Sequence, residues 1–297
     1  MNINLGIAPI AWSNDDMPEL GGDTSIETCL FEAKSAGFSG IELGGKFPRN
    51  PGTVKFLINK FNLALPGGWY GSKLREKSID EEWQAMQEQI KLFKLVGSSV
   101  FVFADVSGSI QSQPNIPLSN RPQLGDNEWN EYCGKIYEIS KRLSDVGLPM
   151  SYHQHMGTII QSEQDIDRLL NNTNDYTSLL FDTGHLLFAQ VNCEEILKKY
   201  INRINHIHFK DIRKNILEKS ILEDLSFIDS ILEGIFTVPG DGCIKYKPLL
   251  KILYNNKYTK WLVIEAEQDP KKANPFEYAK ISFNYLTQIL TEVGYNI

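Results

Sequence analysis

The sequence predicts an α/β protein that folds as a single (β/α)₈ barrel spanning residues 1–297. Short apolar runs alternate with helical patterns along the chain, which indicates parallel strands joined by crossover helices. Eight such pairs within this length favour a closed barrel over an open doubly wound sheet. No G-x-G-x-x-G motif follows the first run, which argues against a dinucleotide-binding fold. No Gly/Ser-rich or Pro-rich linker divides the chain, so we expect one domain.

The expected strands are short apolar runs. They lie at residues 4–10, 39–44, 63–69, 99–105, 148–155, 177–185, 204–211 and 260–267. Helical patterns follow them at residues 25–37, 53–61, 79–96, 130–147, 162–172, 193–201, 246–256 and 275–293. Element boundaries read from sequence carry an error of about two to four residues.

Individual elements carry local signals in chain order. The first helix opens with Ser25 and Thr28 around Glu27, a pattern typical of a capped helix start. The third helix, 79–96, is long and amphipathic. A polar loop rich in Ser, Gln, Pro and Asn follows the fourth strand, and a long connection follows the seventh. The chain ends in a helix from about Pro275 to Val293.

Composition limits the classes of partner and the location. The formal net charge of −7 argues against nucleic acid, since phosphate contacts need clustered Lys and Arg. No window approaches the roughly 18 apolar residues needed to span a bilayer, so we expect no membrane partner. The N-terminus lacks a basic leader before a long apolar core, which predicts no signal peptide. The four cysteines show no CxxC spacing and are expected to be free thiols of a cytoplasmic protein.

Ligand-type side chains gather at the ends of the later strands. Three strand candidates carry pairs of residues two apart: His153 and His155, His206 and His208, Glu265 and Glu267. Residues two apart in a strand point to the same face. Strand six ends in Asp182, with His185 one turn on. All of these lie at the C-terminal end of an apolar run, where barrel active sites are built.

Imidazole and carboxylate oxygen together suit divalent Mn²⁺, Fe²⁺, Co²⁺ or Zn²⁺. Without a thiolate among the donors, a catalytic Lewis-acid site is favoured over a structural zinc site. Each residue also has a simpler interpretation. His206 fits a hydrogen-bonded core histidine, Asp182 a helix N-cap, and Glu267 a solvated loop residue. The distribution favours a site, because all five histidines lie in strands five to seven.

Three further residues are candidates for substrate contact near the mouth of the barrel. Glu42 ends the second strand and could face the mouth, or pair with Lys46 or Arg49. Trp69 could form an apolar wall for a ring-shaped substrate, or pack in the core. Asp105 ends the fourth strand and could bind substrate or support a ligand.

The segment after strand seven holds two basic candidates. Lys210 and Arg213 follow His208 closely and could hold substrate oxygens, with a surface salt bridge as the alternative. The segment 239–242, "PGDG", is a turn by composition and could lie over the mouth.

A family resemblance joins these segments. The chain resembles the inosose dehydratases of myo-inositol catabolism, in the xylose-isomerase-like (endonuclease IV-like) barrel superfamily, from residue 5 to about 275. The segments that carry the resemblance are "GIAPIAWSNDDMPELGGD", "GIELGGKFPR", "HQHMGT", "FDTGH", "HIHFKDIR", "PGDG" and "IEAEQDPKKANP". "WSNDDMPELGGD" and "EAEQDP" are the most specific, whereas "DTGH" and "HxHxKD" belong to the wider superfamily.

The resemblance implies a divalent-metal enzyme that dehydrates 2-keto-myo-inositol to a trihydroxycyclohexane-dione. It implies Co²⁺ or Mn²⁺ as the metal and glutathione as a possible cofactor. By the same resemblance, the metal ligands are His153 (where many relatives have Glu), Asp182, His208 and Glu265. A homodimer is also expected, as barrels of this group often pair.

Two positions depart from the family pattern. The chain reads "HQHMGT" where the family usually has three consecutive histidines, and we expect Gln154 to point away from the site. Asp105 stands where relatives commonly have Glu, which puts a direct role for Asp105 in doubt.

Dehydration of a keto-inositol requires a base at the α-carbon and an acid at the departing hydroxyl. We expect His155 or Glu267 as the base, and His185 or Lys210 as the group that assists departure. The alternative activity is a ketose epimerase or isomerase on the same barrel, which returns the proton instead of losing water. Two weaker alternatives are an endonuclease IV-type phosphodiesterase, which needs more ligands, and a non-catalytic sugar-binding barrel.

Overall fold

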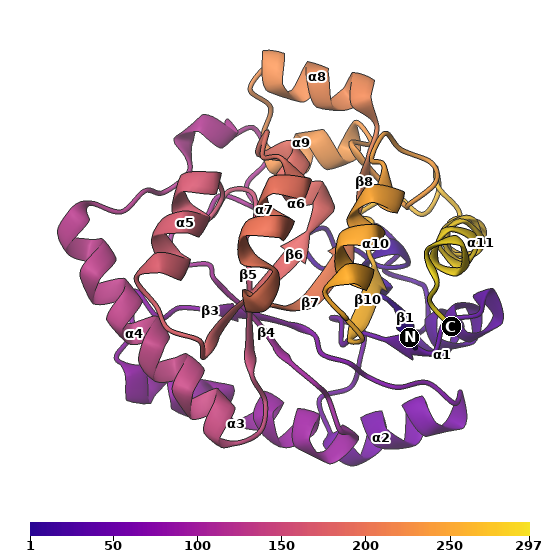
Figure 1. Cartoon of the computed structure of the whole chain (residues 1–297), viewed down its shortest axis with the longest axis horizontal. Coiled ribbons are helices and arrows are strands. Elements are labelled where there is room, and N and C mark those ends of the chain that lie inside the picture. The colour runs from indigo at the N-terminus through magenta and orange to yellow at the C-terminus, as the bar shows by residue number, and fades with distance from the viewer.

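The computed structural model describes all residues, 1–297, and confirms the predicted barrel class. Eight parallel strands form one sheet in the order β2-β1-β10-β7-β6-β5-β4-β3. The strands are β1 (Asn4–Ile7), β2 (Gly40–Ile41), β3 (Trp69–Ser72), β4 (Phe101–Asp105), β5 (Met150–His153), β6 (Thr177–Asp182), β7 (Ile204–Phe209) and β10 (Trp261–Ile264). The helices surround these strands (Figure 1).

The barrel closes through the segment that precedes β3. The amide of Ile41 donates to the carbonyl oxygen of Ala64 at 2.9 Å, and Leu43 donates to Gly67 at 3.0 Å. The backbone at Gly68 lies so close to Leu43 that a Cβ there would come within 2.6 Å of the leucine side chain. Only glycine permits this approach.

The third strand differs from its predicted position at 63–69, because the regular strand begins only at Trp69. Residues 64 and 68 make isolated parallel bridges to the β2 segment instead. Pro66 lies between them, and proline has no N–H to donate to a neighbouring strand. The apolar run therefore identifies the correct segment, and Pro66 explains why regular strand pairing begins only at Trp69.

The outer layer contains eight helices close to their predicted ranges. They are α1 (Ile26–Ala36), α2 (Pro51–Lys60), α3 (Ile79–Val96), α4 (Asp126–Asp145), α5 (Glu163–Asn171), α7 (Cys193–Tyr200), α10 (Tyr246–Asn255) and α11 (Pro275–Val293). A further short helix, α6 (Thr183–Phe188), begins within the predicted sixth strand, because Asp182 ends β6 and caps the helix. The Ser25 hydroxyl accepts from the Thr28 amide, as the capping pattern predicts. α4 begins four residues before its expected start, because Glu128 accepts the Gly125 amide at 2.7 Å and caps the helix there. Three short 3₁₀ turns cover Pro9–Ala11, Leu118–Asn120 and Ile201–Arg203.

The long connection after β7 has a structure of its own. It holds two antiparallel strands, β8 (Asp211–Ile212) and β9 (Phe236–Thr237), and two helices, α8 (Lys214–Leu222) and α9 (Phe227–Leu232). These helices lie outside the main ring (Figure 1). Eleven buried residues form a separate apolar cluster there, which includes Phe227 and Phe236. Both rings pack against His185, so this insertion covers one side of the candidate site.

The main apolar core contains 63 buried residues drawn from both ends of the chain. The two termini meet, since the Ile3 amide donates to Asn296 and the Asn296 amide donates to Met1. All four cysteines are free thiols, as predicted. None of the helices combines the length and the apolar character required to cross a membrane.

Candidate metal centre and active-site pocket

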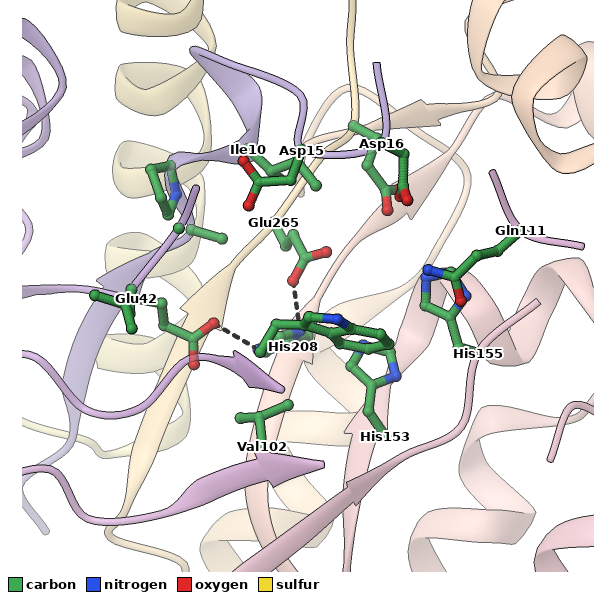
Figure 2. Close-up of a pocket in the computed structure, with 16 residues that line it drawn as sticks. Ile10, Asp15, Asp16, Glu42, Val102, Gln111, His153, His155, His208 and Glu265 are labelled. Carbon is green, nitrogen blue, oxygen red and sulfur yellow. Dashed lines mark ion pairs between the residues drawn. The ribbon is translucent and has the colours of Figure 1, made fainter. Parts of the chain in front are cut away.

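A pocket lined by 16 residues opens where the carboxyl ends of the strands meet. Its polar lining comprises Asp15, Asp16, Glu42, Gln111, His153, His155, His208, Glu265 and Glu267. Trp69 and Val102 contribute an apolar wall. In Figure 2, His208 lies between Glu42 and Glu265, His153 and His155 lie beside it, and Asp15 and Asp16 lie beyond Glu265.

His208 lies at the centre of the polar cluster. Strand pairing places it beside Asp182 of β6 and Val263 of β10. Its Nδ1 lies 2.5 Å from Oε2 of Glu265 and 3.7 Å from Oδ2 of Asp182. Against the effect of burial, the carboxylates of Glu265 and Glu42 raise the pKa of His208 well above its usual value. The surroundings therefore favour positive charge at this point.

His153 presents an unprotonated nitrogen to the same cluster. Its Nδ1 lies 2.6 Å from the carbonyl oxygen of Gln154. A carbonyl can only accept, so Nδ1 carries the proton and Nε2 keeps its lone pair. That Nε2 lies 3.7 Å from Oδ2 of Asp182. Burial lowers the pKa of His153 to about 4, which keeps the imidazole neutral as a metal ligand requires.

Asp182 combines both of the roles considered for it. Its Oδ1 accepts the His185 amide at 2.8 Å and caps α6. Its Oδ2 is buried without any hydrogen-bond partner. The carboxylate is thus fixed by one oxygen and leaves the other for a cation.

His153, Asp182, His208 and Glu265 each offer a ligand atom within 4.8 Å of the others, and all four residues are buried. Besides Asp182 Oδ2, neither ring nitrogen of His208 has a hydrogen-bond partner of good geometry. Buried polar atoms are normally satisfied, so unpaired atoms that converge are what a metal site leaves without its ion. The donor set of two imidazoles and two carboxylates fits a divalent first-row metal.

Glu42 lines the pocket, as predicted for a residue at the mouth, and also supports the histidines of β7. Its Oε1 lies 2.7 Å from Nε2 of His206, and its Oε2 lies 3.0 Å from Nε2 of His208. Although burial opposes it, His208 and His206 hold the pKa of Glu42 at about 2. The prediction that His206 is a hydrogen-bonded core histidine is confirmed.

A second group of ligand-type residues adjoins the first. His155, His185 and Glu267 offer atoms within 4.8 Å of one another. The Nδ1 of His155 lies 2.9 Å from the carbonyl oxygen of Met156, so its Nε2 is the free acceptor by the same reasoning as for His153. Burial, His153 and Lys210 lower the pKa of His155 to about 3. Burial raises the pKa of Glu267 to about 8, against the lowering effect of Lys210.

Lys210 and His185 lie beneath the pocket surface. The Lys210 ammonium is 2.9 Å from Oε2 of Glu267, 2.9 Å from Oε1 of Glu265 and 3.0 Å from Nε2 of His185. Both residues are fully buried and neither lines the pocket. Both side chains therefore lie one layer behind the pocket wall.

Trp69 occupies its predicted place as a wall of the pocket. Its ring centroid lies 5.5 Å from that of His153 and 5.3 Å from that of His155. Gln154 points away from the pocket, as expected, and donates to the carbonyl oxygens of Gln161 and His185.

Asp105 and Arg213 lie outside the pocket, which corrects their predicted substrate contacts. The Asp105 carboxylate accepts the backbone amides of Arg75 and Ser107 and so shapes the loop after β4. Arg213 donates to the carbonyl oxygens of Gly234 and Phe236 within the insertion. In both cases local backbone groups satisfy the side chain. The "PGDG" segment also lies outside the pocket, since none of residues 239–242 lines it.

Sequence reasoning missed three polar residues of the pocket: Asp15, Asp16 and Gln111. All three lie on loops, where strand periodicity gives no signal. The paired acids within the specific "WSNDDMPELGGD" segment were the available clue. Asp15 accepts the Gly45 amide at 2.8 Å, which ties the first loop to the second across the mouth.

The fold and the pocket define a barrel that gathers histidines and carboxylates able to hold a metal ion at the carboxyl ends of its strands. Residues 30–289 match the family described as xylose isomerase-like TIM barrel. The chain is 43% identical over 279 residues to inosose dehydratase 2 of Bacillus cereus, covering 93% of this chain and 94% of that protein. It is 39% identical to the rhizopine catabolism protein MocC of Rhizobium meliloti, covering 100% and 91%.

Solved structures show the same fold at low identity. The probable 3-DHS dehydratase AsbF of Bacillus anthracis superimposes with a TM-score of 0.71 at 14% identity, covering 97% of this chain and 99% of that one. An L-ribulose 3-epimerase superimposes with a TM-score of 0.69 at 14% identity, covering 98% and 95%. The chain belongs to the xylose isomerase-like TIM barrel family and, within it, to the inosose dehydratases. It is a dehydratase, a carbon–oxygen hydro-lyase.

Proposed function

We propose that the protein removes water from 2-keto-myo-inositol (scyllo-inosose) to give a trihydroxycyclohexane-1,2-dione in myo-inositol catabolism. One observation carries the proposal: a chain 43% identical to an inosose dehydratase brings four metal-type ligands together, three of which line the pocket. Trp69 supports it further, because an aromatic wall suits the apolar face of a cyclic polyol ketone.

The residues proposed to hold a divalent ion are His153, Asp182, His208 and Glu265. Co²⁺ or Mn²⁺ suits this donor set. Such an ion supplies Lewis-acid stabilisation to an oxygen that gains negative charge as the α-proton leaves. Glu42 orients His208 from the other side of the ring, because its Oε2 forms an ion pair with Nε2 at 3.0 Å while Nδ1 faces the proposed ligands.

His155 is the proposed base. Its Nδ1–H donates to the Met156 carbonyl, so the Nε2 lone pair is fixed as the acceptor of a residue that lines the pocket. A base must reach the proton that it removes, and His155 stands beside Trp69 and His153, between the wall and the metal ligands.

The Lys210–Glu267 pair is the proposed source of the proton for the departing hydroxyl. Glu267 lines the pocket, and its Oε2 contacts the buried Lys210 ammonium at 2.9 Å. Lys210 therefore acts through Glu267, and His185 positions Lys210 through its Nε2. Of these three residues, only Glu267 lines the pocket and can contact the substrate directly.

The test is a metal-reconstituted assay with 2-keto-myo-inositol against several keto-sugars. Dehydration creates a conjugated enol-dione, so we expect ultraviolet absorbance to grow with the keto-inositol only. The solved epimerase shares the fold, and an epimerase would exchange the α-proton with solvent without a gain in absorbance. Exchange without absorbance would overturn the dehydratase proposal in favour of an epimerase.

Three further features belong to the same proposal. Turnover compared with and without glutathione, under anaerobic conditions with another thiol, will separate binding of glutathione from simple reduction of metal and thiols. A homodimer is expected, and light scattering will measure it. We also expect the enzyme to act in the cytoplasm, where the free thiols stay reduced.

A further inference from the structure

The group formed by His155, His185 and Glu267 has the composition of a metal site in its own right. Its two imidazoles and one carboxylate are buried, and their ligand atoms lie within 4.8 Å of one another. It adjoins the first cluster through the His153 and His155 rings, whose centroids are 5.4 Å apart. By donor type alone, this group could bind a second divalent ion.

A side-chain cation already lies among these donors. The Lys210 ammonium is 3.0 Å from Nε2 of His185 and 2.9 Å from Oε2 of Glu267. Glu265 connects the two clusters, because its Oε1 contacts Lys210 at 2.9 Å while its Oε2 approaches Nδ1 of His208. Glu265 thus faces the first cluster with one oxygen and the lysine with the other, as a bridging carboxylate does between two metal ions.

The lysine is held at this position by its neighbours. Its aliphatic chain lies over Gly184, where a Cβ would come within 2.6 Å of the lysine Cγ. Thr183 Oγ1 accepts the Lys210 amide at 3.1 Å and donates to the Lys210 carbonyl at 2.8 Å. The ammonium also lies 4.7 Å from the centre of the Phe236 ring. Gly184 and Phe236 therefore both help to position the Lys210 ammonium.

Lys210 already supplies a positive charge to the second group of donors. Its ammonium contacts Oε1 of Glu265 and Oε2 of Glu267, both at 2.9 Å. A second divalent ion beside Lys210 would add like charges in a buried site, where repulsion is poorly screened. Removal of the ammonium would leave these two buried carboxyl groups without their cation, which is unfavourable unless another cation takes its place.

We propose that the Lys210 ammonium occupies a second cation position formed by His155, His185, Glu267 and Glu265, and thereby limits the protein to one divalent ion. A neutral side chain at residue 210 then opens a second metal site. This inference presupposes the first metal site proposed above, and the experiment reports on the two sites separately.

The experiment measures bound Mn²⁺ per chain by equilibrium dialysis and elemental analysis. We expect one ion for the wild type, two for Lys210→Met, and one for Lys210→Arg, which keeps the positive charge. The double variant Lys210→Met with Glu267→Gln should return to one ion, because it loses the carboxylate of the second site. The electron paramagnetic resonance spectrum of Lys210→Met should show two spin-coupled Mn²⁺ ions, since Glu265 would bridge them.

Wild-type protein that binds two ions, or a folded Lys210→Met that binds one, overturns the inference. Wild-type protein that binds none overturns the first site instead. To detect a variant that folds only with metal, the melting temperature of Lys210→Met is measured with increasing Mn²⁺. Lys210→Gln serves as a second neutral variant. A larger Mn²⁺-dependent rise in melting temperature for both neutral variants than for wild type supports the proposal, and an equal rise contradicts it.

Discussion

Glu42 and Glu265 face opposite nitrogens of the same His208 ring, at 3.0 Å from Nε2 and 2.5 Å from Nδ1 (Figure 2). Glu42 also holds His206, one inward-facing position deeper on β7. A carboxylate behind a metal-binding histidine fixes its tautomer and increases its basicity. A residue that directly follows the second strand therefore supports a proposed metal ligand on the seventh.

Glu42→Gln is expected to weaken Mn²⁺ binding by about 10- to 100-fold, the usual cost of losing such a partner. The glutamine side chain is neutral and has only one accepting oxygen, so it cannot serve both His206 and His208 as the carboxylate does. Isothermal titration with Mn²⁺ measures the change. Asp16→Asn is the matched control, since Asp16 lines the same pocket without an ion pair to any histidine. Equal affinities for wild type and Glu42→Gln would refute the role of Glu42.

Metal removal should lower the stability of the folded protein. Chelation leaves Asp182 Oδ2 buried without a hydrogen-bond partner. Mn²⁺ at about 100 times its dissociation constant should raise the free energy of unfolding by about 2.7 kcal/mol, from mass action. Asp182→Asn should abolish this gain while the Oδ1 cap of α6 remains. Denaturant unfolding with and without Mn²⁺ is the measurement, and an undiminished gain in Asp182→Asn would exclude it as a ligand.

Strand periodicity predicted which residues would share a face, but it could not predict their depth. His206 and His208 point to the same side of β7, yet one is held in the barrel interior and the other faces the pocket. Depth depends on the register with β6, where His206 pairs with Leu180 and His208 with Asp182. A shift in that register, between Leu179 and Leu180, is a property of the folded sheet.

Loop residues show the other limit of sequence reasoning. Asp105 ends a strand at the same end of the barrel as the ligands, but nearby backbone amides take up its carboxylate. Asp16 lies on a loop without periodicity and still lines the pocket. The backbone conformation decides which polar side chain is hydrogen-bonded to nearby amides and which one faces the pocket. A single sequence shows no pattern from which this can be predicted.

Arg213 is expected to contribute to stability and not to substrate binding. Its guanidinium holds β9 and the insertion through Gly234, Phe236 and Asp241. Arg213→Ala should lower the free energy of unfolding by about 1–3 kcal/mol, as for loss of hydrogen bonds to a charged group. The KM for the keto-inositol should change less than about twofold, because we expect Arg213 to make no contact with the substrate. A large rise in KM with unchanged stability would restore the substrate role.

Asp211 should make stability depend on pH. Burial raises its pKa from 3.8 to about 6, although it accepts the amides of Ile212 and Ile244. Since the folded state holds this proton more tightly, the contribution of Asp211 is full below about pH 4 and is lost as pH rises through about 6. Asp211→Asn should therefore gain stability relative to wild type across this range. Urea unfolding at several pH values measures the difference, and the exposed Asp145→Asn is the control. A difference that does not change with pH would contradict the raised pKa.

His155 provides the most direct test of the proposed chemistry. His155→Ala removes the only nitrogen lone pair that lies in the pocket outside the four proposed ligands. We expect kcat to fall by about 10²- to 10⁴-fold, the usual contribution of a general base, with Mn²⁺ still bound at one ion per chain. His155→Gln should fall as far, because an amide cannot accept a proton near neutral pH, and it controls for the lost volume beside Trp69. Near-full turnover with metal bound would assign the base to Glu267 instead, and Glu267→Gln would then show the loss expected of His155.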